Sequence, residues 1–491
     1  MIGTDPLLFP TLSLETQALV RSLYGALMCL MLAAALPHWR RYFLTERWHG
    51  YTKSSGFRDA VQNPAAIAAW LALWLVAIGG LTAGRLVVAA AAFNLASCYY
   101  FFNRLRWTSV SRGGGAPGFI ALWLAAAVFL LELTTRHAPA VRGLAILALQ
   151  VDFGAIMLSA GLYKLAAGYR HRHGMELGMV NPEWGYWPSF WKAWPPDHVV
   201  FRFFNELAWT TEVVCGAMML FSPTRMLGGA GIFLSFIFIA SQIRLGFLAE
   251  MVMVCCLLFI PAGSVVDGWM VPFWQRLDAP ISTAGVLLPQ PAQAVLLSAL
   301  WIYIALLPLV RAGMFYNQLR HRSLPSGLQR ALDLYANTFG LILWRVFTAD
   351  VVNFFVRIWE QPASGTRRLI SQFHRTGPSR FSQVAECIAL TSVFTTLKYY
   401  PTNHALFEER LFRYARTIPH AATSELVFEW VKVEPRDDRF DYLPAAEFVI
   451  DPGITKVTET VLDPAISVRQ VPGVSPVHEG ARPGSYAPLK S

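Results

Sequence analysis

Long apolar runs alternate with short polar loops over roughly the first two thirds of the chain. A helix needs roughly 20 apolar residues to cross the hydrocarbon core of a membrane, and several runs approach that length. We interpret nine of them as membrane-spanning helices: Ala18–His38, Ala65–Leu81, Arg85–Phe102, Gly118–Leu133, Leu144–Tyr169, Val200–Phe221, Met226–Ile243, Leu245–Ile260 and Ala292–Val310. The first run lacks a small-residue cleavage motif, so it predicts a retained helix rather than a signal peptide.

After Arg311 the hydrophobic runs shorten and polar residues interleave with them. Short stretches rich in β-branched and aromatic residues predict strands, and two longer stretches have helical character. The expected strands are Leu341–Phe347, Asn353–Glu360 and Leu426–Glu434, and the expected helices are Ser382–Lys398 and Ala405–Ile418. The pattern thus predicts a multi-pass α-helical membrane domain (1–311), a water-facing, β-rich α+β domain (312–463) and an extended Pro- and Gly-rich tail (464–491).

Composition agrees with this division. The 491 residues are 55% hydrophobic and only 15% charged, and the mean hydropathy is +0.41, which is typical of an integral membrane protein in contact with a lipid bilayer. The net charge of +10 sits mostly in loops beside the apolar runs, which favours membrane-flanking charge over nucleic-acid binding. Five of the six cysteines fall in apolar runs and none forms a C-x-x-C pair, which argues against disulfides, zinc and iron–sulfur clusters.

The distribution of lysine and arginine predicts an orientation. The loops after the first, third and fifth expected helices are rich in basic residues, whereas the opposite loops carry few. Because basic residues are retained on the cytoplasmic side, this bias favours an outside N-terminus and a cytoplasmic C-terminal region.

Lys164 lies near the end of the apolar run Leu144–Tyr169, where a charge is costly and often functional. Two interpretations stay open: a desolvated lysine that serves as a base, or an anchor that reaches the headgroup layer. Asp152 is twelve residues away, roughly 18 Å along a helix, so the partner should come from another helix. The candidates are Glu206, Glu212, Gln242 and Arg244. An equally open alternative is a structural pair of Glu212 or Glu250 with Arg244.

The loop from Arg170 to Val199 concentrates aromatic residues among prolines. Its aromatic members are Trp184, Tyr186, Trp187, Phe190, Trp191 and Trp194. Such a loop is typical of an aromatic belt in the headgroup layer, and it could also be a lid over a cavity for a lipid or quinone-like ligand. His171 and His173 have no nearby carboxylate or cysteine partner and indicate a solvated basic helix end rather than a metal site. The glycine run 113–115 indicates a loop rather than a phosphate cradle.

Several short motifs occur in an order known from one membrane superfamily. They are Ala160-Gly161-Leu162-Tyr163-Lys164-Leu165, the aromatic loop, Glu212 before an apolar run ending in Ser222-Pro223-Thr224-Arg225, Ser241-Gln242, and Leu343-Trp344-Arg345-Val346-Phe347. Between Arg21 and Glu360 the chain resembles vitamin K-dependent gamma-glutamyl carboxylases, bacterial HTTM-domain proteins and lipase maturation factors. The resemblance implies a protein of the bacterial inner membrane.

In the carboxylases the lysine corresponding to Lys164 deprotonates vitamin K hydroquinone, so the resemblance implies a catalytic base here and a reduced quinone as cofactor. The implied cofactor-contacting residues are Tyr163, Trp184, Trp187, Glu212, Gln242 and Arg244. The chain departs from the carboxylases in two ways: residues 103–118 contain no histidine, and the domain after the membrane helices is shorter. The superfamily also places the lysine-side loops outside the cytoplasm, opposite to the orientation that the basic residues favour.

Three functions remain open at this point. The first is a carboxylase-type membrane enzyme in which Lys164 acts on a lipid-soluble cofactor or substrate. The second is a non-catalytic maturation factor or accessory subunit whose C-terminal domain and tail bind a protein partner. A transporter is less well supported, because the sequence shows no inverted repeat or paired broken helices.

Overall fold

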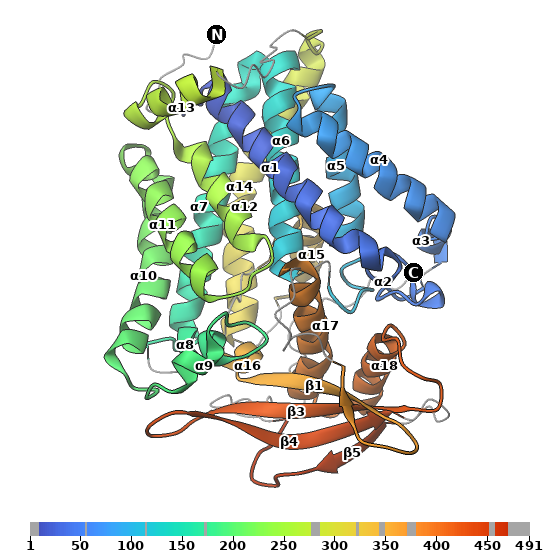
Figure 1. The fold of residues 1–491 in the computed structure, drawn as a ribbon. Coiled ribbons are helices and arrows are strands. Elements are labelled where there is room, and N and C mark those ends of the chain that lie inside the picture. The colour runs from blue at the N-terminus through green and yellow to red at the C-terminus, as the bar shows by residue number, and fades with distance from the viewer. Residues whose placement is uncertain are drawn as a thin grey trace.

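A bundle of long helices stands on a small antiparallel sheet in the computed structural model (Figure 1). The structure describes residues 9–54, 56–112, 115–170, 174–275, 285–320, 324–342, 349–370, 380–450 and 457–469. The N-terminal end of α1 lies at the end of the bundle that is far from the sheet, and the sheet closes the opposite end. The chain is therefore a helical membrane protein with a C-terminal antiparallel sheet, as the hydrophobic pattern predicted.

Every apolar run of the sequence lies on a helix. The helices of the bundle are α1 (Leu14–Ala35), α4 (Pro64–Thr82), α5 (Val87–Cys98), α6 (Gly115–His137), α7 (Arg142–Ala166), α10 (Val199–Leu220), α11 (Arg225–Gln242), α12 (Leu248–Cys256) and α14 (Gln290–Arg320). Shorter helices lie between them: α2 (Trp39–Phe43), α3 (Gly56–Asp59), α8 (Met175–Val180), α9 (Pro188–Lys192) and α13 (Val265–Gln275).

The expected count of nine membrane spans is not supported. Among the described residues, six helices are long and apolar enough to cross a membrane, namely α1, α4, α6, α7, α11 and α14. α5 has 12 residues before a π-helical turn, and α12 has 9, so both are shorter than a full span. α10 is long enough but carries Glu206 and Glu212, which lower its hydropathy. All nine apolar runs are helical, as predicted. Three of them are too short or too polar to count as membrane spans, so the number of spans is corrected from nine to six among the described residues.

Helix ends follow local capping chemistry. The Ser13 hydroxyl accepts a hydrogen bond from the Thr16 N–H at 3.0 Å and caps α1. Asn63 caps α4 in the same way, and Pro64 occupies the first helical position, where no backbone donor is needed. α15 (Ser326–Phe339) ends at Gly340, whose φ of 69° is the left-handed conformation that glycine adopts without strain. These capping residues set where α1 and α4 begin and where α15 ends.

The sheet has five strands in the order β2-β1-β3-β4-β5, with antiparallel pairing throughout. Their bounds are β1 (Phe354–Gln361), β2 (Arg368–Leu369), β3 (Glu425–Pro435), β4 (Phe440–Ile450) and β5 (Val457–Val461). Two of the three expected strands, 353–360 and 426–434, are confirmed as β1 and β3. The third, 341–347, lies mostly outside the described residues, as does the tail from 470 onwards.

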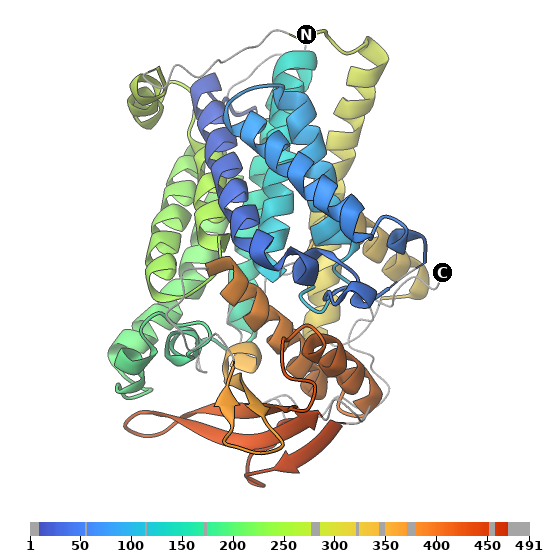
Figure 2. The same cartoon turned by 45° about the vertical axis from the view of Figure 1, so that its right-hand side comes forward.

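Two helices separate the sheet from the bundle (Figure 2). They are α17 (Arg380–Tyr399) and α18 (His404–Ala415), both close to the expected positions, and α16 (Ala349–Val352) leads into β1. Phe394 of α17 packs edge-on against Phe448 of β4, with ring centroids 5.4 Å apart. Phe407 of α18 meets the same ring at 5.2 Å. The aromatic core between α17, α18 and the sheet fixes their relative positions.

Buried polar contacts tie the sheet half to the bundle. The Arg41 guanidinium contacts both oxygens of Glu386 on α17, at 2.6 and 2.9 Å. The same carboxylate accepts the hydroxyls of Tyr51 (2.5 Å) and Tyr414 (2.6 Å). On another side, the Asn181 amide donates to the carbonyls of residues 352 and 354, each at 2.8 Å. The sheet is therefore fastened to the membrane half at two places.

Candidate functional site

Lys164 on α7 forms an ion pair with Glu212 on α10, with 2.6 Å between Nζ and Oε1. The side chains are only 4% and 5% exposed. Glu212 was one of the partners considered from the sequence, and Asp152 is engaged elsewhere, as the helical rise indicated. A buried pair of this kind neutralises two charges that neither lipid nor a protein interior would otherwise tolerate.

Glycine brings α7 and α10 close enough for this pair. A Cβ on Gly161 would lie 2.7 Å from the Val213 backbone nitrogen and 2.9 Å from the Glu212 Cβ. Gly154 on α7 and Gly216 on α10 are similarly crowded by the facing helix. Small residues at such an interface let two membrane helices pack backbone against backbone. The glycine in the Ala160–Leu165 motif thus positions the lysine.

The surroundings of Lys164 are polar and buried. Its ammonium lies 5.9 Å from the centre of the Tyr169 ring. Nearby, Glu176 of α8 accepts from the Asn205 amide at 2.7 Å, and the Asn205 oxygen in turn accepts the Met175 N–H at 2.8 Å. Within the described part of the chain, Oε2 of Glu212 is buried without a hydrogen-bond partner. Lys164 thus lies in a buried polar layer that contains Glu212, Tyr169, Glu176 and Asn205.

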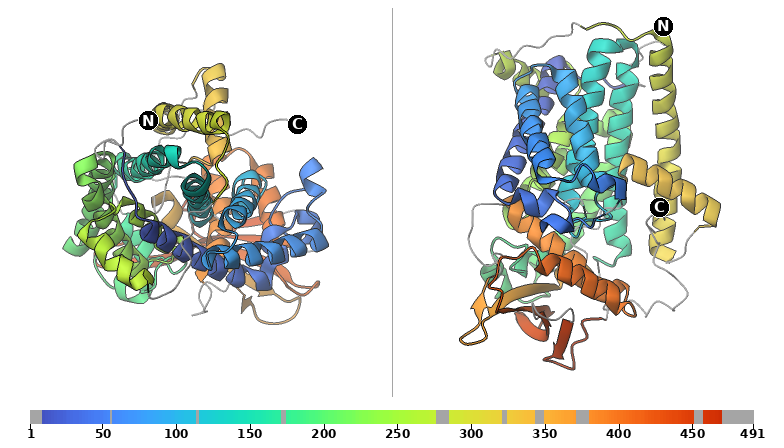
Figure 3. Two further views of the ribbon diagram at one scale, coloured as in Figure 1. Left: turned by 90° about the horizontal axis from the view of Figure 1, so that it is seen from above. Right: turned by 90° about the vertical axis from the view of Figure 1, so that its right-hand side faces the viewer.

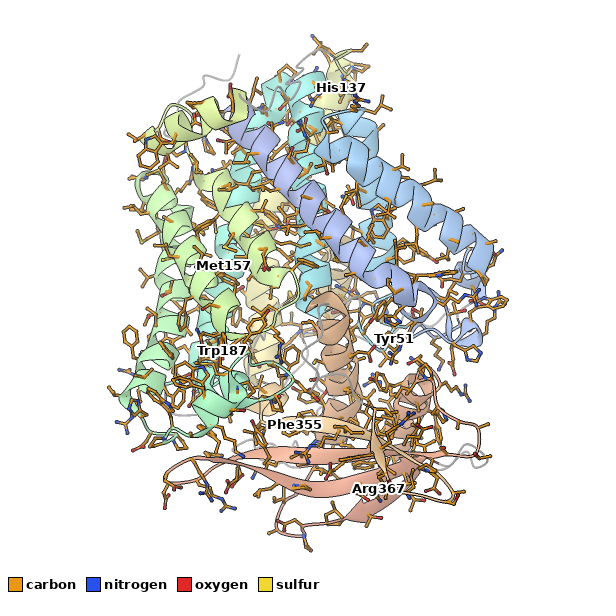
Figure 4. The ribbon with its side chains drawn as sticks, viewed as in Figure 1. Tyr51, His137, Met157, Trp187, Phe355 and Arg367 are labelled. Atoms are coloured by element: carbon orange, nitrogen blue, oxygen red, sulfur yellow. The ribbon has the colours of Figure 1, made fainter. Side chains whose placement is uncertain are left out.

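The aromatic loop packs at the sheet-facing end of α10 and α11, where Figure 4 shows Trp187. The Trp187 indole donates to the Ser241 carbonyl and the Trp191 indole to Oε1 of Gln242, both at 3.1 Å. Trp187 is 59% exposed. An exposed indole at a helix end is typical of an aromatic belt, which was one of the two interpretations of this loop.

Arg244 contacts the same aromatic loop. Its guanidinium donates to the Pro182 carbonyl at 3.0 Å and lies 5.1 Å from the Tyr186 ring centre. Its backbone N–H donates to the carbonyl of Trp184, which is buried. Glu212 pairs with Lys164, so the alternative pairing of Glu212 with Arg244 does not occur. Of the predicted cofactor-contacting residues, Glu212 therefore contacts Lys164, whereas Trp184, Trp187, Gln242 and Arg244 belong to the aromatic loop and its contacts. Tyr163 is buried and precedes Lys164 on α7.

A cavity of about 560 Å³ lies elsewhere in the bundle, among α5, α6, α7 and α14 and against residues 338–342 at the end of α15. Its walls are mostly apolar, including Leu95, Phe119 and Leu149. Asp152 and Arg311 also line it, and Lys164 does not. Pockets of this size with few polar groups are typical sites for small lipophilic ligands.

Asp152 is the centre of the polar group in this cavity. Its Oδ1 accepts from Nη2 of Arg311 at 2.8 Å. Its Oδ2 accepts from the Trp123 indole and from the Tyr303 hydroxyl, both at 2.8 Å. Arg311 also approaches the Ser159 hydroxyl at 3.4 Å. Two helices, α6 and α14, thus contribute three donors to a single buried carboxylate on α7.

Sequence reasoning named Asp152 only as one polar group among several and treated Arg311 as the end of the membrane domain. α14 continues to Arg320, so Arg311 lies inside a helix of the bundle. The sequence did indicate that these two residues need partners, because a carboxylate and a guanidinium in apolar helices are too costly to leave unpaired. Trp123 and Tyr303 carried no signal, because aromatic residues are common in membrane helices.

Glu183 is a buried carboxyl that lies outside the candidate spans. Oε1 of Glu183 accepts the Val356 N–H of β1 at 2.8 Å, and Glu183 is 2% exposed. Burial raises its pKa to about 8, although the Val356 hydrogen bond favours the charged form. The thiol of Cys387 donates to the Glu183 carbonyl at 3.5 Å. Glu183 links the aromatic loop to the sheet.

Comparison of the chain with protein-family models, curated proteins and solved structures gave no match. The resemblance to the carboxylase-like superfamily therefore depends on the short sequence motifs alone. Two of the sequence features discussed above, His171–His173 and the start of the glycine run, lie outside the described residues, as does the whole 343–347 motif.

Proposed function

We propose that the protein binds a lipid-soluble, quinone-like molecule inside the membrane and belongs to the carboxylase-like superfamily. The observation that carries the proposal is the apolar cavity of about 560 Å³ with the buried Asp152–Arg311 pair on its wall. A membrane-embedded cavity that held only lipid tails would not need such a pair, since ionisable groups there are costly. The bacterial inner membrane would be the source of such a molecule.

Lys164 has a place in this proposal as a proton-handling residue. Its pair with Glu212 leaves one carboxylate oxygen without a partner among the described residues. A proton could move from Lys164 to Glu212 and leave a neutral amine, which is the form that acts as a base. Catalysis by Lys164 requires that the ligand reach it, and Lys164 does not line the cavity.

Lipid extraction from the protein purified in mild detergent tests this proposal. We expect a stoichiometric isoprenoid quinone or similar lipophile in the extract, detected by mass spectrometry. Leu149→Trp would fill the cavity, so the bound molecule should be absent from the extract of this variant. Val76→Trp, on the outer, exposed face of α4, should leave the amount of bound molecule unchanged. Equal amounts of the molecule in the two variants would contradict binding in the cavity. In an activity assay with the bound molecule, Lys164→Met should abolish turnover if the lysine is the base.

The accessory-subunit function is the second candidate. It is favoured by the way the sheet is fastened to the bundle through Glu386 and Asn181, because a rigid platform suits the binding of a partner protein. Co-purification with one stable partner should survive Lys164→Met and be lost when the chain is truncated after Pro464. Loss of the partner in the lysine variant would argue against this function.

A further inference from the structure

α18 contacts two loops of the bundle through ion pairs in which cations outnumber carboxylates. The Glu409 carboxylate lies 2.6 Å from the ammonium of Lys53 and 2.6 Å from the guanidinium of Arg413. The Glu46 carboxylate lies 2.6 Å from Arg416 and 3.7 Å from Arg413. The right-hand view of Figure 3 shows α17 and α18, in orange, between the blue loops of the bundle and the sheet. Two carboxylates therefore serve three cations at this contact.

Arg410 adds another cation to this contact, and among the described residues no ion pair neutralises it. Its Nη1 donates to the Thr396 hydroxyl of α17 at 2.7 Å. The side chain is half-buried, and its Nε and Nη2 are accessible and have no hydrogen-bond partner in the described part of the chain. Burial and the nearby guanidiniums of Arg112 and Arg413 lower the pKa of Arg410 to about 10. Arg410 is therefore charged at neutral pH and lies in a positive potential, which a bound anion would relieve.

Arg410 and Arg112 come from separate segments that are tied to each other. Arg413 lies one turn after Arg410 on α18, and its Nη1 donates to the Thr108 carbonyl at 3.2 Å. Thr108 belongs to the loop 105–112, which ends at Arg112. The backbone of this loop is thus fastened to α18, so the two guanidiniums are held near each other before any ligand binds. We call Arg112 and Arg410 the basic site.

The basic site lies at the level where the membrane helices end. The loops that contact α18 adjoin candidate spans at their sheet-facing ends. In one loop the Arg106 guanidinium lies 4.5 Å from the ring centre of Trp107, which is 42% exposed. In the other, Arg47 lies 5.1 Å from the ring centre of Trp48. Tryptophans and arginines at the ends of spans are typical of the headgroup layer, so the basic site lies at the depth of lipid phosphates.

We propose that the basic site binds the phosphate of an anionic phospholipid from the leaflet on the sheet side, where α17, α18 and the loop 105–112 meet. This inference goes beyond the proposed function and does not depend on it. A guanidinium donates two parallel hydrogen bonds to phosphate oxygens, and basic pockets beside membrane helices bind lipid head groups. The excess of cations disfavours a zwitterionic lipid, because its ammonium group would be repelled.

Native mass spectrometry of the full-length protein in mild detergent tests this inference. The probes are phosphatidylglycerol and phosphatidylcholine with identical acyl chains, titrated separately. We expect phosphatidylglycerol to bind about 25-fold more tightly, since each of the two basic residues near a lipid surface contributes about fivefold. Arg410→Gln should lower this preference to about fivefold, and Arg410→Gln/Arg112→Gln should abolish it.

A control variant and thermal unfolding separate lipid binding from a structural role of Arg410. Arg439→Gln removes the same charge from the β3–β4 turn, where the side chain is 60% exposed, and should leave the preference unchanged. Without added lipid, Arg410→Gln should unfold at the temperature of the wild type or above it, because the substitution removes one of several like charges. Phosphatidylglycerol should raise the Tm of the wild type and raise that of Arg410→Gln much less.

Three results would overturn the proposal. Equal affinity of the wild type for the two lipids would exclude an anionic-lipid site without the use of any variant. An Arg410→Gln protein that keeps the full preference, or that unfolds at a lower temperature and keeps the full shift with phosphatidylglycerol, would make Arg410 a structural contact only. Displacement of phosphatidylglycerol by an equal concentration of inorganic phosphate would assign the basic site to a free anion instead of a lipid.

Discussion

The Asp152 carboxylate and the Arg311 guanidinium meet at 2.8 Å inside the bundle, although 159 residues separate them in the chain. The pair joins α7 to α14. Among the candidate spans α14 is one of the most exposed helices, because only 17% of the residues in its most apolar stretch are buried inside the protein. This buried polar contact adds to the apolar packing of α14 on α7, in which Leu300 and Leu307 take part. The cavity depends on this contact, because its walls come from both helices.

We expect Asp152→Leu to destabilise the protein by about 3–5 kcal/mol, because it leaves the buried Arg311 charge uncompensated. The double variant Asp152→Leu/Arg311→Leu should recover most of that stability, since neither charge remains. Thermal or denaturant unfolding in detergent measures both. A double variant as unstable as the single one would show that the hydrogen bonds of Trp123 and Tyr303, and not the charge, hold the helices together.

Gly161→Ala tests the packing that positions Lys164. Its Cβ would meet the Val213 nitrogen at 2.7 Å, a backbone atom that cannot move alone, so α7 and α10 must separate. We expect a loss of about 1–3 kcal/mol in the free energy of unfolding. Gly79→Ala on α4 is the matched control, because a Cβ there meets nothing within 4 Å and alanine is the better helix former. Equal effects at the two sites would mean that the α7–α10 interface tolerates separation.

Glu183 predicts a dependence of stability on pH. Its pKa is raised by burial to about 8, so between roughly pH 4.5 and pH 8 the folded protein binds a proton that the unfolded chain has lost. The stabilising effect of the neutral carboxyl is complete below pH 4.5 and is lost as the pH rises to 8. The contribution of this group to the free energy of unfolding should fall by about 1.4 kcal/mol per pH unit in this window.

Glu183→Gln isolates that contribution. The amide oxygen of glutamine can still accept the Val356 N–H, but the side chain does not titrate. The difference in unfolding free energy between the variant and the wild type should therefore grow from pH 5 to pH 8. Parallel pH profiles for the two proteins would mean that Glu183 keeps an ordinary pKa in the folded state.

The helices and two of the strands could be predicted from the sequence because their signals are local. Apolar runs of helical length and alternating aromatic residues in 354–361 need no knowledge of the rest of the chain. The strand β4 was missed because Pro444 and the charged positions around it obscure the alternation. The strand β5 was missed because it is only five residues long and mostly exposed, so it has no apolar face to recognise. The pairing of Asp152 with Arg311 depends on how α14 packs, and no local pattern specifies which of several buried charges meet.

The site illustrates the same limit. The lysine motif identified Lys164 and a short set of possible partners, because intramembrane charges are rare and must be neutralised. The cavity could not be predicted, since its shape arises from five separate segments and its lining is ordinary apolar sequence. The position of the α15 end against the cavity could not be predicted either, because nothing in the sequence shows that Asn103 and Arg106 donate hydrogen bonds to Asn337.

The arrangement of loops predicts which end of the molecule faces the cytoplasm. The loops at the sheet end are rich in basic residues, whereas those at the far end carry few, so retention of positive charge places the sheet in the cytoplasm. The described basic residues of the sheet-end loops include Arg40, Arg41, Arg47, Lys53, Arg104, Arg106, Arg112, Arg170, Lys192 and Arg244. The resemblance to the carboxylases implies the opposite orientation, so the two arguments can be separated by experiment.

Single engineered cysteines decide between these orientations. Ala83→Cys lies in an exposed turn after α4, at the far end, and Asp438→Cys lies in the exposed β3–β4 turn. In intact cells, a membrane-impermeant maleimide should label the first variant, and it should label the second only after the membrane is permeabilised. Four of the natural cysteines are buried, and the wild type gives the background from all six. Labelling of Asp438→Cys in intact cells, with Ala83→Cys protected, would place the sheet outside the cytoplasm as the resemblance implies.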